Sequence, residues 1–339
     1  MVNRGQSPIF RLPILLLGFI SLALGIAGGL VRLGASIPAP AGAIALHGAL
    51  MVSGFLGTVI GLERAVALGR LWAYAAPLAS GLGGLCLVFG LVAPGFALLA
   101  LAAALLVAAS LAVLARQPSL EMATLAAGAL AWLAGNLSLY AGAPAVPWWI
   151  AFFALTIGGE RLELSRYLKR GALARDAFIV LAAALLAAPL LPRVLGVVLV
   201  LLALWLFAYD LARVTVRQRG LPRYIAWCLL SGYAWLAFGG ALLAAAVAYD
   251  AALHAIFVGF VFSMVFGHAP VILPAVLRVK LPYHPALYLP LALLHASLAL
   301  RVFVSPLAGA WGNAAAIALF IVTAAALVVR RLSSGAPRR

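Results

Sequence analysis

This sequence has very little charge, and its charge is almost all of one sign. Only 9% of its 339 residues are charged, with seven acidic residues against 23 lysines and arginines. A water-soluble domain needs a charged surface, so this scarcity excludes that class. A formal net charge of +16 would suggest a nucleic-acid partner for a soluble protein. Here the basic residues lie in short connections between apolar runs, where they orient a membrane chain, and we expect no nucleic-acid partner.

The sequence also lacks the patterns of several enzyme and metal-site classes. Its two cysteines, Cys86 and Cys228, lie in apolar runs with no CxxC or histidine spacing, so we expect buried, unreactive thiols. No GxGxxG, Walker loop, HExxH or CxxCH pattern occurs. Nucleotide binding and covalently attached c-type haem therefore have no support in the sequence.

What the chain has in abundance is apolar length. Hydrophobic residues make up 67% of it, in successive runs of roughly 20 residues, which is the length that crosses a bilayer. We predict an all-α polytopic membrane protein, with residues 1–339 forming a single transmembrane domain of about twelve helices. The expected spans are 11–33, 41–62, 71–92, 94–115, 119–140, 147–168, 176–191, 194–214, 223–248, 252–276, 284–304 and 307–329.

Basic residues alternate between the two sides of these spans. Most of them fall in connections that share one side with the N-terminus, whereas the opposite connections hold only Arg32, Arg193 and Arg301. Positively charged loops remain in the cytoplasm. We therefore predict a bacterial-type inner-membrane protein with both termini cytoplasmic.

A weak internal repeat links spans two, six and ten. Their inner ends read GFLGTVIGLERA, FFALTIGGERLE and GFVFSMVFGHAP, and each follows a glycine-bearing apolar run with a polar pair. Because these spans are four apart, the chain is predicted to contain three four-helix units, at about 11–115, 119–214 and 223–329. The alternative is that glycine-rich helix ends resemble one another by composition alone.

Histidines inside membrane spans are the main functional clue, because titratable groups are costly there. At 1.5 Å per residue, His47 lies about 9 Å and His254 about 4 Å from the non-cytoplasmic side. Their spans run in the same direction, so the two imidazoles are nearly level. Two level histidines are what an axially bis-histidine haem requires. His295, nearer mid-membrane, is a candidate third member of this cluster.

Two arginines at the same side fit this interpretation. Arg32 ends the first span and Arg301 lies near the end of the eleventh. Haem propionates need cationic partners, and arginine binds carboxylates bidentately. The alternative is that both side chains only extend to the membrane interface.

The other titratable residues give weaker signals. His268 precedes Pro270 and Pro274, which distort its helix, so a metal, proton-relay or gating role competes with a structural one. His284 lies at the membrane boundary, where we expect a structural role. Asp210 is expected to pair within the basic run 213–223, and Glu160 with Arg161 at the cytoplasmic edge.

Two segments carry a resemblance to a known family. Leu46–Met51, LHGALM, resembles the segment of haem–copper oxidase subunit I whose histidine ligates the low-spin haem, and FGHAPVILP at 266–274 resembles its copper-binding FGHPEVYxLILP segment. The resemblance implies haem ligation by His47 and makes His268 a candidate metal ligand. The oxidases' remaining histidines have no counterparts here, so a dioxygen-reducing haem–copper centre is not expected.

The chain is more similar to the NnrS-type membrane proteins, although their HxHEM and GHTGR patterns are absent. This resemblance implies haem b, with copper as a further candidate, and a role in nitric oxide or nitrogen-oxide metabolism or in respiratory electron transfer. The partners would be a periplasmic electron carrier or quinol and a diatomic gas. The alternatives are a cofactor-free transporter or channel and an accessory or assembly subunit of a respiratory complex.

Overall fold

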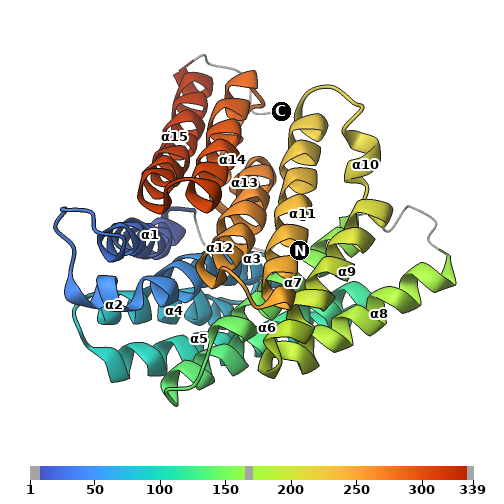
Figure 1. Ribbon diagram of the computed structural model, residues 1–339, viewed down its shortest axis with the longest axis horizontal. Helices are drawn as coiled ribbons and strands as arrows, with labels where there is room; N and C mark the ends of the chain where they lie inside the picture. Colours follow the sequence, from blue (N-terminus) through green and yellow to red (C-terminus); the bar gives the residue numbers. More distant parts are fainter. Residues whose placement is uncertain (1–7, 165–170, 334–339) are drawn as a thin grey trace. The chain divides into compact units, whose positions relative to one another are not determined.

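The computed structural model describes residues 8–164 and 171–333, and within these ranges the protein contains helices and no strands (Figure 1). The predicted all-α class is confirmed. The helices that match one predicted span each are α1 (Leu12–Arg32), α4 (Ala75–Val88), α5 (Val92–Arg116), α6 (Leu120–Tyr140), α7 (Val146–Leu164), α8 (Ala172–Ala187), α9 (Pro192–Tyr209), α11 (Leu221–Ala245), α14 (Tyr288–Phe303) and α15 (Pro306–Ser333).

Short helical segments extend or connect these helices. The 3₁₀ turns η1 (Pro8–Arg11), η3 (Leu71–Tyr74) and η6 (Pro285–Leu287) precede α1, α4 and α14, while η4 (Ala188–Leu190) follows α8 and α10 (Ala212–Thr215) follows α9. The expected break near Pro192 is present, because η4 ends at Leu190 and α9 begins at Pro192. The end of the predicted sixth span, 165–168, lies outside the described residues.

Eleven of the helical stretches in the described ranges are long and apolar enough to cross a membrane, so the chain is a multi-pass membrane protein whose apolar surfaces suit a lipid bilayer. The helix α7 is not among the eleven. Its last five residues include Glu160, Arg161 and Glu163, and this charge lowers its apolar character.

Two of the long helices contain a π-helical insertion. In the first, α2 (Ala41–Ala49) continues through the π segment η2 (Leu50–Gly57) into α3 (Thr58–Leu68). In the second, α12 (Tyr249–His254) continues through η5 (Ala255–Phe262) into α13 (Ser263–Leu277).

Both π segments have eight residues, place Gly-Phe at positions five and six, and return to α-helix at a hydroxyl residue. The sequence similarity between spans two and ten thus has a conformational counterpart. The third repeat, in span six, has no π segment, because α7 is α-helical throughout.

The chain forms two compact units. The first contains the residues up to Glu160 together with Ala275–Leu277, and the second contains Arg161–Pro274 and the residues from Arg278 onward. Each unit includes one of the two π segments. We describe each unit by itself.

Close helix packing in the first unit depends on small residues. Helix α1 packs on α2, η2 and α4, and α5 packs between α4 and α6. A Cβ atom at Gly28 of α1 would collide with the Ala43 carbonyl of α2, and one at Gly42 would collide with the Leu87 carbonyl of α4. Without side chains at these points the backbones come into contact, which is the usual mode of helix association in membranes.

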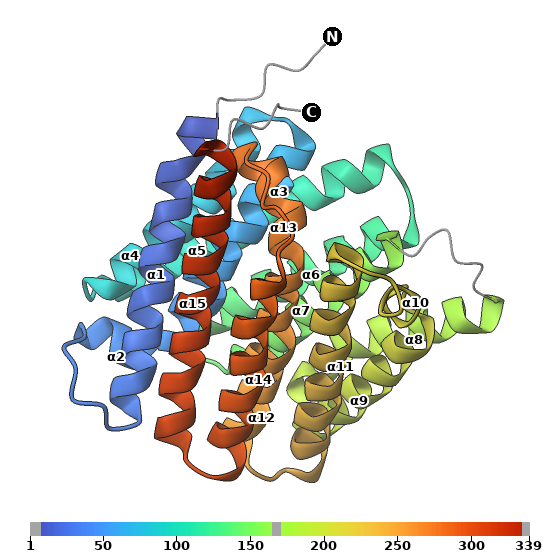
Figure 2. The same ribbon diagram turned by 90° about the horizontal axis from the view of Figure 1, so that it is seen from above.

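The second unit is built in the same way. Helix α11 packs against α9 and η5, and α14 and α15 lie side by side (Figures 1 and 2). Gly196 of α9 faces Gly240 of α11, and Gly309 of α15 faces the backbone of Arg301 in α14. The contact between Gly309 and Arg301 fixes the end of α14, and Arg301 is one of the predicted site residues.

Candidate cofactor site

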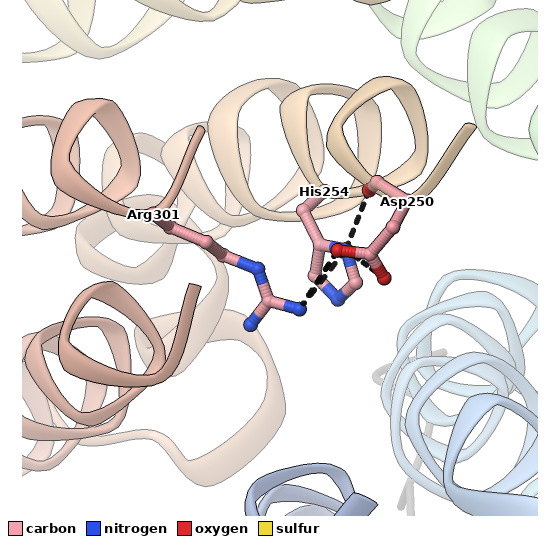
Figure 3. Close-up of polar contacts among 3 residues, drawn as sticks. All are labelled: Asp250, His254 and Arg301. Carbon is pink, nitrogen blue, oxygen red and sulfur yellow. Dashed lines mark hydrogen bonds and ion pairs between the residues drawn. The ribbon is translucent and has the colours of Figure 1, made fainter. Parts of the chain in front are cut away.

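His254 is held by the first turn of its own helix. Its Nδ1 lies 2.7 Å from the Asp250 carbonyl oxygen and 3.3 Å from Asp250 Oδ1, one helical turn earlier (Figure 3). A carbonyl oxygen only accepts hydrogen bonds, so Nδ1 carries the hydrogen. In the neutral ring the lone pair is then on Nε2. This atom makes no hydrogen bond with the described residues, and the side chain is 22% exposed.

Metal-ligating histidines usually have such an arrangement. In such sites one ring nitrogen donates to a carbonyl or carboxylate, which fixes the tautomer and raises the basicity of the other nitrogen. Asp250 provides both kinds of acceptor. The structure therefore presents His254 Nε2 as an available ligand atom.

Arg301 reaches the same cluster from the last turn of α14 (Figure 3). Its Nη2 lies 3.3 Å from Asp250 Oδ2 and 3.3 Å from His254 Nδ1. Both Nη2 and the protonated Nδ1 are donors, so the attractive contact is the ion pair with Asp250. Arg301 Nε is buried and has no hydrogen-bond partner among the described residues. A buried donor of this kind calls for an acceptor, because leaving it unsatisfied costs about 1–3 kcal/mol.

His47 lies in the first unit, at a local distortion of α2. The preceding residue, Leu46, has non-helical backbone angles of φ −119° and ψ 26°. The π segment η2 begins three residues after His47, as η5 begins directly after His254. Gly29 of α1 faces the ring, since a Cβ there would lie 3.5 Å from His47 Cδ2. Ligation of one iron by His47 and His254 would join the two units, and it stays a prediction.

His295 has a different environment from the one its depth suggested. Trp235 Nε1 donates to its Nδ1 at 3.0 Å, while its Nε2 lies 2.8 Å from Ser231 Oγ and 3.3 Å from Ser263 Oγ. The indole nitrogen only donates, so Nδ1 accepts and Nε2 carries the hydrogen. Both ring nitrogens are thus engaged in tying α14 to α11 and α13. Sequence reasoning missed these partners, although Ser231 and Trp235 share a helix face.

His268 belongs to a second, separate cluster in the second unit. Its Nδ1 donates to the Met264 carbonyl at 2.9 Å, within a helix that also contains Pro270 and Pro274. The charged side chains of Arg161 and Asp210 interact electrostatically with His268.

Arg161 Nε lies 3.7 Å from Asp210 Oδ2, and the two side chains are only 6% and 2% exposed. The expectation that Asp210 pairs within the basic run 213–223 is therefore wrong. The end of α9 instead buries Asp210, whose Oδ1 accepts a hydrogen bond from the Ala212 amide at 2.6 Å.

Two further candidates, His284 and Arg32, are each described by their local contacts. His284 caps η6, where its Nδ1 accepts from the Ala286 amide at 3.1 Å. Arg32, at the end of α1, is exposed and makes no polar contact with the described residues. Within residues 8–164 and 171–333, no three His, Cys, Asp or Glu side chains are gathered to hold a metal ion. A bis-histidine haem has only two protein ligands, so it does not need such a group of three.

A buried network in the first unit also escaped the sequence analysis. Asn136 Oδ1 accepts from Ser53 Oγ at 2.8 Å and from Trp149 Nε1 at 3.1 Å, and Asn136 Nδ2 donates to the Leu99 carbonyl at 3.0 Å. Trp132 Nε1 donates to Ser53 Oγ at 3.0 Å. The network joins η2 to α5, α6 and α7. Its one sequence signal is a lone asparagine within an apolar span.

Comparison with known proteins places the chain in a family. A family model described as "Domain of unknown function (DUF8744)" matches residues 11–329. The chain belongs to the DUF8744 family. No curated protein and no solved structure matches this chain. The resemblance to NnrS-type proteins and to haem–copper oxidase subunit I therefore stays a prediction from the two motifs.

Proposed function

We propose that this DUF8744 protein binds b-type haem in a bacterial-type inner membrane and acts in nitric oxide or nitrogen-oxide metabolism or in respiratory electron transfer. The observation that supports this most directly is the geometry of His254. Its Nδ1 is fixed by Asp250, and its Nε2 makes no hydrogen bond with the described residues.

The donor set fits a haem. Imidazole nitrogen is a common axial ligand of haem iron, and His47 occupies the position that the oxidase-like motif assigns to such a ligand. Arg301 is held by Asp250 through one terminal nitrogen, and its guanidinium group would bind a propionate. Arg32 would provide the second propionate contact. His295 is not part of this set, since its hydrogen bonds engage both ring nitrogens.

Each side chain has a stated task in this proposal. When bound, the haem supplies one-electron redox chemistry. Asp250 orients the His254 ring, and its carboxylate also offsets the charge of Arg301. With both termini in the cytoplasm, this cluster would lie near the periplasmic side, within reach of a periplasmic electron carrier, a quinol or a diatomic gas. Copper stays a separate prediction, with His268 as its candidate ligand.

The test is an absorption spectrum of detergent-purified protein, expressed with sufficient haem and reduced with dithionite. We expect the sharp α-band of a low-spin b haem. His47→Ala and His254→Ala should each abolish the band. The matched control, His284→Ala, should retain it, because His284 only caps a short helix.

Two other results would decide against the proposal. Loss of the band in His284→Ala as well would show that the effect comes from misfolding and not from ligand loss. Colourless wild-type protein would instead favour the cofactor-free transporter or the assembly subunit.

A further inference from the structure

A pocket of about 390 Å³ lies in the second unit, and no histidine lines it. It forms where the connection before α11 meets the segment that leads into α14. Its lining residues are Arg219, Gly220, Arg223, Trp227, Tyr283 and Tyr288. This volume is within the range of small-molecule binding sites.

The pocket has an uncompensated positive charge. Arg219 and Arg223 are exposed and make no ion pair or hydrogen bond with the described residues. Gly220 lies between the two arginines, directly before the first turn of α11. Its φ of +73° is in the left-handed region, which favours glycine. The amide groups of that 25-residue helix begin here, so its dipole adds to the arginine charge. An anion is the complementary ligand.

The walls of the pocket are aromatic. Trp227 lies one turn after Arg223 on α11 and is 46% exposed. The Tyr288 ring is held edge-on against the buried Tyr224, with ring centroids 5.2 Å apart. Tyr283 adds a second phenol. Tryptophan and tyrosine gather at membrane–water interfaces, where one side of the ring meets lipid and the other meets headgroups.

We propose that this pocket binds a phosphate group, such as the phosphodiester of an anionic phospholipid headgroup. The two guanidinium groups would bind the phosphate oxygens with charge-assisted hydrogen bonds. The aromatic walls would contact the glycerol and the first acyl carbons. Basic pockets between membrane helices are known to hold anionic lipid headgroups. The inference is independent of haem binding.

The test is native mass spectrometry of the full chain, delipidated in a neutral detergent. It is titrated separately with phosphatidylglycerol, phosphatidylcholine and inorganic phosphate. We expect phosphatidylglycerol to bind at least tenfold more tightly than phosphatidylcholine. The double variant Arg219→Gln/Arg223→Gln should lose roughly 30-fold in affinity, since each basic residue contributes modestly to such contacts.

A matched control removes the same charge from the same connection. Arg213→Gln/Arg217→Gln changes two arginines that do not line the pocket, and we expect less than a threefold effect. If the pocket double variant unfolds, the single variants Arg219→Gln and Arg223→Gln should each show about a fivefold loss.

The competition arm identifies the source of the phosphate. If inorganic phosphate at millimolar concentration displaces phosphatidylglycerol, the site holds a soluble phosphate, and if it does not, the site holds a lipid. Equal binding of the two lipids with no phosphate binding would overturn the proposal. An equal loss in the control variant would also overturn it, because the preference would then reflect general surface charge.

Discussion

The buried ion pair of Arg161 and Asp210 predicts a large loss of stability when either partner is removed. Both side chains are almost fully buried, at 6% and 2% exposure, with Arg161 Nε 3.7 Å from Asp210 Oδ2. Removing one partner leaves the other charge in a low-dielectric interior, which typically costs about 3–5 kcal/mol. We therefore expect Asp210→Ala to lower the free energy of unfolding by this amount.

A second substitution separates the charge from the hydrogen bond. Asp210 Oδ1 also accepts the Ala212 amide hydrogen at 2.6 Å. Asp210→Asn retains an acceptor there but removes the charge, so it should be less damaging than Asp210→Ala by about 1 kcal/mol. The assay is reversible unfolding in mixed detergent micelles, followed by circular dichroism.

A double-mutant cycle tests whether the two charges act on each other. Arg161→Met combined with Asp210→Ala removes both charges, so it should cost less than the sum of the single changes by at least 1–2 kcal/mol. Additive single effects would refute the reasoning. A cost below about 1 kcal/mol for Asp210→Ala would do the same, since it would show that the carboxylate is not in a dry interior.

Three further predictions follow from the packing and hydrogen bonds. Asn136→Ala should destabilise the protein by about 2–4 kcal/mol in the same assay, because it leaves several buried groups unsatisfied; a loss below 1 kcal/mol would contradict this. Gly42→Ala should cost about 1–3 kcal/mol, because a Cβ would strike the Leu87 carbonyl, whereas Gly171→Ala, which has open space, should be within 0.5 kcal/mol of wild type. His295→Ala should lower stability by about 1–3 kcal/mol yet keep the haem α-band, and loss of the band in stable protein would return His295 to the ligand set.

The helices could be predicted from the sequence because an apolar run in a membrane must satisfy its backbone hydrogen bonds internally, and an α-helix does so. Even the short break before Pro192 was visible, since proline and the neighbouring arginine interrupt the hydropathy there. The π segments were not predictable. An apolar run such as AIFVGFVF carries no local signal that separates a π-helix from an α-helix.

Side-chain contacts between different helices were the second feature that the sequence did not predict. Depth along a helix placed His254 and Arg301 near one end of the bundle, and the structure brings both onto Asp250. Depth says nothing about rotation, so His295 turned toward Trp235 was not foreseen. Asp210 was assigned to nearby arginines because sequence distance was the only guide, whereas the fold pairs it with Arg161.

The central claim is that the chain holds haem b between His47 and His254. The most direct measurement is the pyridine haemochrome content of the purified protein, expressed with added haem precursor and compared with iron by elemental analysis. The account predicts haem b and iron in equal amounts, at one of each per chain, with both lost from His254→Ala. Protein that folds and purifies normally but contains neither haem nor iron would contradict it.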